Sequence, residues 1–268
     1  MLNKDLQKKI DTLSDILRGY RTVAVAFSGG VDSTFLLKQA HDALGRNVTA
    51  VTALASNFAP DEIAEAIEFC DEEGICQLLI GMGETFLEII ADNPVDRCYL
   101  CKRRIFSEFL AHPKLAGAVL VDGSNSDDAF DFRPGEKALH ELGVKSPLRE
   151  AGLTKEDIRA ASMEIGLATW DKPAFACLAS RVPYGEKITK EKLQSIYALE
   201  KQLHECGFSQ VRVRRHGDLA RIEVLPEDRE KFFDTAFMDR INKAAKEAGF
   251  TFAALDLGGY KMGSLNLL

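Results

Sequence analysis

Residues 22–33 read TVAVAFSGGVDS, and this stretch decides the fold class. It opens with a continuous apolar run that is short enough to form one buried strand of a parallel sheet. Two glycines follow, and a helical pattern then continues to about Leu44. A buried strand that leads through a short turn into a helix predicts an α/β protein.

Strands and helices alternate on both sides of this stretch. Before it, apolar residues recur at helical spacing at Leu6, Ile10, Leu13 and Leu17. After it we expect strand 48–53, a helix from Pro60, strand 75–80, a helix that carries Cys98 and Cys101, strand 117–122 and helix 154–166. Thr154 and Asp157 have the spacing of a capping box at the start of that last helix. This order predicts a doubly wound parallel sheet.

The pattern changes at Thr169, where prolines and small residues interrupt the helical periodicity. Beyond this segment we expect helix 189–206, strands 210–216 and 220–225, helix 227–247 and strand 250–257. That order describes a small α+β domain with an antiparallel strand pair. We therefore expect an α/β domain over 1–168, a functional connecting loop over 169–188 and an α+β domain over 189–268.

The composition is that of a soluble globular protein, with 268 residues, 46% apolar and 28% charged. The chain has no run of eighteen apolar residues and its first seventeen lack the apolar centre of a signal peptide, so we expect a cytoplasmic protein without a membrane partner. Its net charge of −7 disfavours a broad nucleic-acid surface, although VRVRRH at 211–216 could form a local basic patch. The six cysteines are expected to be thiols, metal ligands or catalytic groups rather than a disulfide framework.

The turn after the first strand has the features of a phosphate site. Gly29 and Gly30 let the backbone approach an anion, and the following helix presents its unpaired N–H groups and positive dipole end. The hydroxyls of Ser28 and Ser33 add donors, and Asp32 is best explained as a ligand of Mg²⁺ on a nucleotide. The turn has neither the lysine of G-x-x-x-x-G-K-[ST] nor the pattern G-x-G-x-x-G. The alternative is a tight strand-to-helix turn without a ligand.

A second candidate is VDRCYLCKRR at 95–104, which holds two cysteines with two residues between them. From the residues alone this pair could be half a zinc site, a redox disulfide, part of an iron–sulfur cluster or an accident of composition. Lys102 beside it could meet a substrate phosphate or simply solvate a helix face.

The motif S-G-G-x-D-S resembles the PP-loop of the ATP pyrophosphatase superfamily, with its adenine nucleotide alpha hydrolase-like fold. Stretches 122–135, 141–159, 169–189, 211–224 and 255–266 resemble, in order, the LarE family within that superfamily. LarE proteins are ATP-dependent sulfur transferases that build the nickel-pincer nucleotide of lactate racemase. Together with the PP-loop, these stretches span nearly the whole chain.

The resemblance implies a reaction. ATP with Mg²⁺ adenylylates a carboxylate of pyridinium-3,5-dicarboxylate mononucleotide and releases pyrophosphate, and a sulfur nucleophile then yields the thiocarboxylate and AMP. The implied partners are this small pyridinium nucleotide, an unidentified sulfide donor and further copies of the chain in a hexamer, with no nucleic acid.

The resemblance also implies the source of sulfur. Cys177 in FACLASR matches the family's sulfur-bearing cysteine, which some members surrender in a single turnover. A subgroup has two further cysteines, and Cys98 and Cys101 match them, so that with Cys177 they would bind a 4Fe-4S cluster whose fourth iron holds the donor sulfide. A buried structural thiol is the alternative for Cys177.

The remaining candidates carry weaker signals. Ser180 and Arg181 follow Cys177 at once, and we expect Ser180 at the nucleotide and Arg181 at a phosphate or the adenylate, where its charge would also favour the Cys177 thiolate; a surface role is the alternative for Arg181. Arg212 and Arg214 share one face of a strand, which by resemblance binds the substrate phosphate and otherwise is a solvated edge strand. Four polar residues could bind a metal or the substrate, or could instead serve as turn and capping residues: Asp122, Ser124, Asp127 and Asp128. Trp170 and Tyr184 could stack on a ring of a ligand or could fill the core.

Two other functions compete with sulfur transfer to a small nucleotide. A PP-loop tRNA thiolase can also combine the loop with a C-x-x-C pair, although the acidic charge opposes it. A nucleotide or redox sensor would keep the loop without catalysing any transfer.

Overall fold

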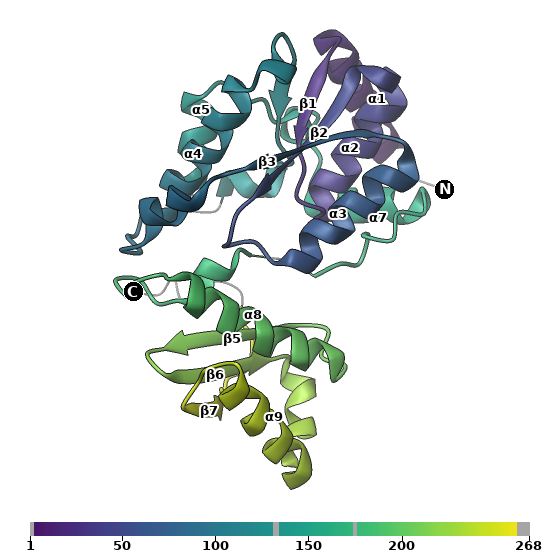
Figure 1. The fold of residues 1–268 in the computed structure, drawn as a ribbon. Helices are drawn as coiled ribbons and strands as arrows, with labels where there is room; N and C mark the ends of the chain where they lie inside the picture. The colour runs from purple at the N-terminus through teal and green to yellow at the C-terminus, as the bar shows by residue number, and fades with distance from the viewer. Residues whose placement is uncertain (1–2, 131–133, 174–175, 262–268) are drawn as a thin grey trace. The chain divides into compact units, whose positions relative to one another are not determined.

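The structure, a computed structural model, describes residues 3–130, 134–173 and 176–261 (Figure 1). Residues 131–133, 174–175 and 262–266, which belong to stretches quoted above, lie outside the described residues. The chain forms two compact units, a large unit of Met1–Phe86 with Asp96–Phe175 and a small unit of Leu87–Val95 with Ala176–Leu268. The change between units at 175–176 falls inside the expected connecting segment.

The large unit is built on a four-stranded parallel sheet with strand order β3-β2-β1-β4. Its strands are β1 (Val23–Ala26), β2 (Val48–Leu54), β3 (Cys76–Gly81) and β4 (Val119–Val121). Val23 of β1 pairs with Val48 of β2 on one side and with Val119 of β4 on the other. The helices are α1 (Lys4–Tyr20), α2 (Val31–Leu44), α3 (Pro60–Glu73), α4 (Arg97–Ala111), α5 (Pro134–Glu141), α6 (Pro147–Glu150) and α7 (Lys155–Glu164).

Helices cover both faces of this sheet, and alternate strand residues pack against each layer. Val23 and Val25 belong to an apolar cluster with α1, α2, α3 and α7, whereas Ala24 belongs to a second cluster with α4 and α5. The central strand β1 is buried on both faces, so it reads as a continuous apolar run in the sequence. The doubly wound parallel sheet is therefore confirmed. The sequence analysis missed the short helices α5 and α6, which lie in a turn-rich stretch.

Local signals set the ends of several helices. α3 begins at Pro60 with two acids in its first turn, as expected. The Thr154 side chain accepts the N–H of Asp157, and the Asp157 side chain accepts the N–H of Thr154, so the capping box of α7 is confirmed.

The small unit contains α8 (Lys190–Glu205), β5 (Val211–His216), β6 (Leu219–Val224), α9 (Thr235–Glu247) and β7 (Phe252–Leu255). β5 pairs antiparallel with β6, and β6 pairs parallel with β7. This α-β-β-α-β order confirms the predicted α+β domain. The prediction of a single helix over 227–247 is wrong, because a 3₁₀ helix (Pro226–Phe233) comes before α9. Asp234 separates the two helices: its backbone is extended, and its side chain accepts the Ala236 N–H as the N-cap of α9.

A short segment before α4 also belongs to the small unit, which the sequence pattern did not indicate. Asn93 donates its side-chain amide to the carbonyl oxygens of Val182 at 3.1 Å and Pro183 at 2.6 Å. The N–H of Ile188 donates to the carbonyl of Ala91 at 2.8 Å. These bonds join the segment Leu87–Val95 to residues about ninety positions later in the chain.

None of the helices in the described ranges has both the length and the apolar character required to cross a membrane. All six cysteines lie in the described ranges, and none of them forms a disulfide bond there.

Candidate functional site

The phosphate loop, which we define as residues 28–33, leads from the end of β1 into α2. Gly30 occupies the N-cap position, and no described side chain caps the helix there. The first backbone N–H groups of an α-helix have no partner within the helix and carry its positive dipole end. The loop therefore offers an anion a set of backbone donors, as its sequence predicted.

Gly29 is the residue that this loop requires to be glycine. Its φ is +72°, and a Cβ atom there would lie 3.3 Å from the carbonyl oxygen of Glu62 and 3.4 Å from the Cβ of Ala66, both on α3. Gly30, in contrast, has φ −81° and would bring a Cβ no closer than 3.5 Å to Ser28 Oγ. Only Gly29 is thus needed for backbone conformation and close helix packing.

The two loop serines bond to each other and to the loop backbone. Ser33 Oγ donates to the Gly30 carbonyl at 3.1 Å and accepts the Ser28 N–H at 3.3 Å. The Ser28 and Ser33 hydroxyl oxygens lie 3.2 Å apart. These bonds shape the loop in addition to any part that the hydroxyls play in binding an anion.

Asp32 lies in the first turn of α2, where its carboxylate is shared by two side chains from distant parts of the large unit. Lys155 Nζ lies 2.5 Å from Asp32 Oδ2, and Asn125 Nδ2 lies 3.4 Å from Oδ1. A second lysine also contacts the loop: Lys172 Nζ donates to the Gly29 carbonyl at 3.1 Å and pairs with Glu65. The sequence analysis missed both lysines, because nothing local to a lysine indicates a partner 123 or 143 residues away.

The segment after β4 packs against the start of α2. A Cβ at Gly123 would lie 3.1 Å from the Ser33 backbone nitrogen, so this glycine allows a close approach. The buried carboxylate of Asp122 accepts bonds from the hydroxyls of Ser124 and, at 2.6 Å, Ser146. Asp122 and Ser124 thus belong to one buried network at the carboxyl end of a parallel strand, where α/β proteins bind ligands.

Asp127 and Asp128 hold backbone N–H groups. Asp128 Oδ2 accepts the N–H of Asn125 at 2.9 Å, and Asp127 Oδ2 accepts the N–H of Lys155 at 2.8 Å. These contacts are those of turn and capping residues, which was one of the two alternatives for Asp127 and Asp128.

The cysteine pair lies in the first turns of α4, as expected. Cys98 and Cys101 are three residues apart on the helix, a spacing that places side chains on one face, and both are half-buried. Asn57 Nδ2 lies 3.8 Å from Cys101 Sγ, within hydrogen-bonding distance of a sulfur acceptor. The stem of Lys102 packs on α5, where a Cβ at Gly135 would lie 2.7 Å from its Cδ.

The pair fits a metal–sulfur group in part. Two thiols on one helical face, with an amide donor at one sulfur, suit iron or zinc. Within the described ranges, however, no three or more His, Cys, Asp or Glu side chains form a group that could hold a metal ion. Cys98 and Cys101 belong to the large unit and Cys177 to the small unit.

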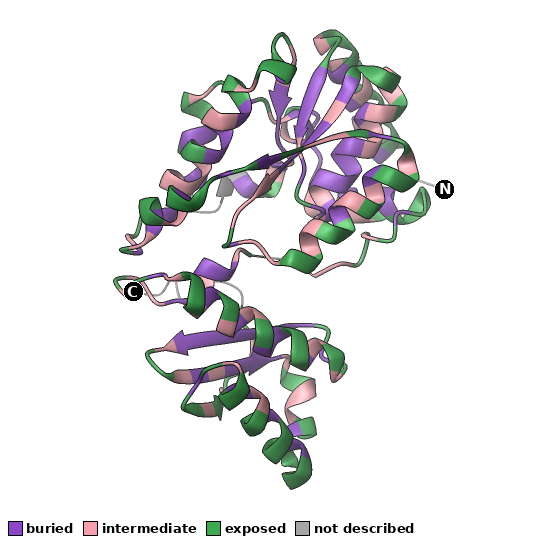
Figure 2. Cartoon of the chain, viewed as in Figure 1, coloured by how far each residue is buried: buried purple, intermediate pink, exposed green. Residues whose placement is uncertain are grey.

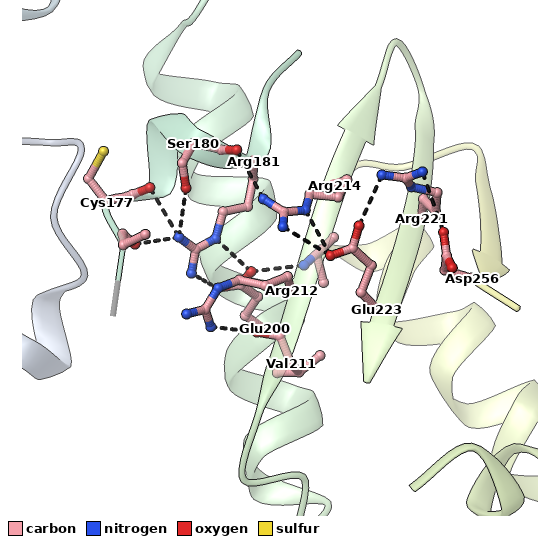
Figure 3. Close-up of polar contacts among 12 residues, drawn as sticks. Cys177, Ser180, Arg181, Glu200, Val211, Arg212, Arg214, Arg221, Glu223 and Asp256 are labelled. Carbon is pink, nitrogen blue, oxygen red and sulfur yellow. Dashed lines mark hydrogen bonds and ion pairs between the residues drawn. The ribbon is translucent and has the colours of Figure 1, made fainter. Parts of the chain in front are cut away.

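Cys177 precedes a short 3₁₀ helix (Leu178–Arg181) and is half-buried. Its carbonyl accepts the N–H of Ser180 at 2.9 Å and Arg181 Nη1 at 3.1 Å. Figure 3 shows its sulfur turned away from the Arg181 guanidinium. Arg181 therefore contacts the backbone of Cys177, which does not support the expectation that its charge acts on the thiol.

Arg181 is a buried residue with a relative exposure of 2%. Its Nε and Nη2 donate to the two carboxylate oxygens of Glu200 on α8 at 2.9 and 3.0 Å. Its Nη1 also donates to the Ala176 carbonyl and to Ser180 Oγ, the latter at 3.1 Å. The surface role is therefore wrong for Arg181. Its bonds instead fix the shape of residues 176–181, which we call the Cys177 loop (Figure 3).

Glu200 joins this loop to the sheet, because its Oε1 also accepts the N–H of Val213 at 2.8 Å. Burial alone would raise the pKa of Glu200, but the charge and hydrogen bonds of Arg181 hold it below its usual value. The carboxylate thereby pairs with a backbone group on β5, an edge strand of the sheet.

Arg212 and Arg214 share one face of β5, as expected, but this face is not solvated. Their relative exposures are 3% and 6%, so the solvated-edge alternative is wrong (Figure 2). Arg214 Nε and Nη2 donate to Glu223 Oε2 on β6, and its Nη1 donates to the Ser180 carbonyl at 3.1 Å. Arg212 donates to the Val211 carbonyl at 2.8 Å and lies 5.5 Å from the centre of the Tyr260 ring.

The small unit therefore contains a buried arginine cluster, which we define as Arg181, Arg212 and Arg214 with Glu200 and Glu223. The pKa of Arg212 is lowered to about 10, mainly because the side chain is buried and secondly because the charge of Arg181 repels it. Three buried cations face two buried carboxylates, and this excess of positive charge favours an anion nearby.

Trp170 is 38% exposed, so the core-filling alternative does not apply to it.

No protein-family model matches the chain. It is nevertheless 41% identical to pyridinium-3,5-bisthiocarboxylic acid mononucleotide synthase of Lactiplantibacillus plantarum, over 97% of this chain and 95% of that protein. It is 38% identical to an uncharacterized protein of Synechocystis sp., over 97% of this chain and 98% of that protein. A weaker similarity, 29% over 70% of this chain and 40% of that protein, links it to a glutamine-hydrolyzing GMP synthase of Clostridium novyi.

Proposed function

Because the chain belongs to the LarE family, which includes pyridinium-3,5-bisthiocarboxylic acid mononucleotide synthase, we propose that it is an ATP-dependent sulfur transferase of nickel-pincer nucleotide biosynthesis. Its substrate is pyridinium-3,5-dicarboxylate mononucleotide. The observation that carries the proposal is the 41% identity over 97% of the chain, which includes both units. The geometry of the phosphate loop supports it independently.

The first half of the reaction belongs to the large unit. A carboxylate oxygen of the substrate bonds to the α-phosphorus of ATP, and the bond from that phosphorus to the β-phosphate oxygen breaks with release of pyrophosphate. The backbone N–H groups of residues 29–33 bind the β- and γ-phosphates. Asp32 would hold Mg²⁺, which neutralises phosphate charge when bound; its carboxylate is an oxygen ligand that suits this ion, and it lies in the first turn of α2, next to the backbone donors for the phosphates.

The second half needs a sulfur nucleophile, which attacks the carbonyl carbon of the acyl-adenylate and displaces AMP. We assign the sulfur to Cys177 or to a 4Fe-4S cluster that Cys98, Cys101 and Cys177 hold together. In the first case the Cys177 thioester loses its Cα proton and its Cβ–Sγ bond breaks, so that thiocarboxylate leaves and dehydroalanine remains. Such a cluster, when bound, would supply the donor sulfide on the iron that lacks a cysteine ligand. The shared helical face of Cys98 and Cys101 and the Asn57 amide at Cys101 support the cluster.

The buried arginine cluster is the proposed site for the substrate phosphate. Arg212, Arg214 and Ser180 would contact it, supported by the excess positive charge and by the bond that joins Arg214 to the Ser180 carbonyl. Arg181 holds the Cys177 loop against Glu200 and is a positioning residue. By family resemblance we also propose a cytoplasmic hexamer, which light scattering on the purified protein would test.

The decisive experiment measures pyrophosphate and AMP release with the dicarboxylate mononucleotide as acceptor. A sulfur transferase of this family releases both and forms thiocarboxylate. A tRNA thiolase would require RNA, and a sensor would release neither product. Asp32→Asn is the control, because it removes the proposed Mg²⁺ ligand without changing the loop backbone.

Iron and sulfide analysis after anaerobic purification tests the sulfur source. Cys98→Ala should abolish iron binding and multiple turnover, whereas Cys76→Ala, which removes an exposed thiol of the same unit, should change neither. If Cys177 is consumed instead, Cys98→Ala should retain one turnover with loss of the sulfur mass from Cys177. Bound zinc in a colourless protein after cluster reconstitution would contradict the cluster.

A further inference from the structure

Residues 256–260, DLGGY, follow β7 and take no part in any step of the proposed reaction. We call them the DLGGY turn. The N–H of Asp256 donates to the Ile222 carbonyl on β6 at 2.8 Å. The N–H of Tyr260 donates to the Val224 carbonyl, at the end of the same strand, at 2.7 Å. The turn is thus attached to β6 at both of its ends.

Gly259 allows the second of these attachments. Its φ is +68°, and a Cβ there would lie 2.9 Å from the Val224 carbonyl oxygen, which is the acceptor of the Tyr260 N–H. Any other residue would strain the backbone and press on that acceptor. The turn therefore requires glycine directly before Tyr260.

Asp256 closes the turn with both of its carboxylate oxygens. Oδ1 accepts the Gly258 N–H at 2.7 Å, and Oδ2 lies 3.4 Å from Nη1 of Arg221 on β6 (Figure 3). The Asp256 carbonyl also accepts the Gly259 N–H at 3.2 Å. Together these bonds fix the backbone from which the Tyr260 side chain extends.

The Tyr260 ring lies against Arg212 of the buried arginine cluster, with 5.5 Å between the ring centre and the guanidinium carbon. A guanidinium within about 6 Å of an aromatic ring is attracted to the negative charge above the ring face. This attraction matters for Arg212, because its side chain is buried and burial disfavours its charge. Tyr260 therefore stabilises a buried cation of the proposed phosphate site.

An aromatic ring holds an arginine differently from a carboxylate. In Arg181 and Arg214, two N–H groups donate to a glutamate carboxylate, which occupies those donors and offsets the charge. A guanidinium has five N–H donors in one plane, and stacking on a ring leaves these donors in place for a ligand. Contact with a ring thus suits an arginine that presents both its charge and its donors to a phosphate.

We propose that Tyr260 is a positioning residue for the substrate phosphate. The DLGGY turn places its ring on Arg212, and Arg212 presents its charge and N–H donors to the phosphate of the pyridinium mononucleotide. The aromatic ring acts in this role, and the phenol hydroxyl does not. This inference rests on the proposed function, since it requires that the buried arginine cluster bind the substrate phosphate.

Tyr197 offers a matched control in the same unit. Its ring lies 5.9 Å from Nζ of Lys201 on α8, and like Tyr260 it is partly buried. This pair also joins a tyrosine to a cation, but neither residue belongs to the buried arginine cluster. A general effect of losing such a contact predicts equal results for the two tyrosines, whereas positioning of Arg212 predicts unequal ones.

The test compares Tyr260→Leu, Tyr260→Phe and Tyr197→Leu in the full-length protein. Calorimetry measures the affinity for pyridinium-3,5-dicarboxylate mononucleotide and, separately, for ATP with Mg²⁺, whose proposed site lies in the large unit; thermal unfolding monitors stability. We expect Tyr260→Leu to weaken binding of the mononucleotide about fivefold or more and to leave ATP binding unchanged. Tyr260→Phe and Tyr197→Leu should bind both ligands as the wild type does.

The outcomes separate this inference from the proposed function. If the wild type binds the mononucleotide and Tyr260→Leu binds it within about twofold as well, the inference is overturned alone. It is also overturned if Tyr260→Phe binds as weakly as Tyr260→Leu, because the hydroxyl would then be the acting group, or if Tyr260→Leu loses affinity for both ligands equally. If the wild type binds neither ligand, the proposed function fails and the role of Tyr260 fails with it.

Discussion

The phosphate loop and the buried arginine cluster are both suited to anions, but they are built in opposite ways. The loop uses backbone N–H groups at the start of α2 and needs glycine at one position. The cluster uses side chains from α8, β5, β6 and the Cys177 loop, among which Arg181 pairs with Glu200 and Arg214 with Glu223. A site made of backbone groups consists of consecutive residues, so a sequence motif can indicate it. A site made of side chains depends on elements that come together only in the folded chain.

The two designs differ in which change they tolerate. Backbone donors survive the loss of a neighbouring side chain but not the loss of their conformation. Buried charges balance one another, so the loss of one leaves another without its partner in a medium that solvates it poorly. Substitutions in each region therefore test this comparison directly.

The largest effect is expected for Glu200→Gln. The change leaves the buried Arg181 without its carboxylate and weakens the bond to the Val213 N–H, so the free energy of unfolding should fall by about 3–5 kcal/mol. Urea unfolding followed by circular dichroism measures it. Glu205→Gln, at the exposed end of the same helix, is the control and should cost less than about 0.5 kcal/mol. Equal effects for both variants would show that the cluster does not carry this stability.

Gly29→Ala should have the second largest effect. Its φ of +72° is unfavourable for alanine and its Cβ would press on the Glu62 carbonyl, so we expect a loss of about 1–3 kcal/mol. Gly30→Ala is the neighbouring control, since its φ is −81° and its Cβ has room. Thermal unfolding of both variants checks the difference. A Gly30→Ala variant as unstable as Gly29→Ala would mean that the loop, not one residue, restricts the backbone.

Helix caps supply a smaller effect of the same kind in both units. Thr154 caps α7 in the large unit and Thr189 caps α8 in the small unit, through bonds to the N–H groups of Asp157 and Lys192. Replacing either threonine by alanine should cost about 1 kcal/mol, because one helix N–H loses its acceptor. Thermal unfolding should show Thr154→Ala as the costlier change, since it also breaks a capping box. The reverse order would contradict this reasoning.

The smallest effect is expected for the pH dependence of the stability that the paired carboxylates of Glu200 and Asp157 contribute. Burial raises the pKa of Glu200 and of Asp157, but Arg181 and Lys9 respectively hold each below its usual value. A lowered folded-state pKa stabilises the protein above the unfolded-state pKa, and this contribution is lost as the pH falls through the folded-state pKa. The stability gap between the wild type and Glu200→Gln should therefore be constant from pH 7 to about pH 5 and shrink below about pH 4.5. A gap that grows with acid would contradict the sign.

Most of the large unit could be predicted from the sequence because its signals are local. The apolar run of β1, the two glycines after it and the Thr154–Asp157 capping box each occupy a few consecutive residues. The order of strands and helices then leaves few ways to form a parallel sheet. The break at Asp234 was missed because a 3₁₀ helix and an α-helix follow one another without a change in composition.

The sequence by itself determined the fold class, the phosphate loop and the strand pair that carries Arg212 and Arg214. Only the tertiary structure decided that these arginines are buried, that Leu87–Val95 belongs to the small unit, and that Lys155 meets Asp32 across 123 residues. The physical reason is that backbone conformation responds to neighbouring residues, whereas burial and ion pairing depend on which distant side chains the packing brings together.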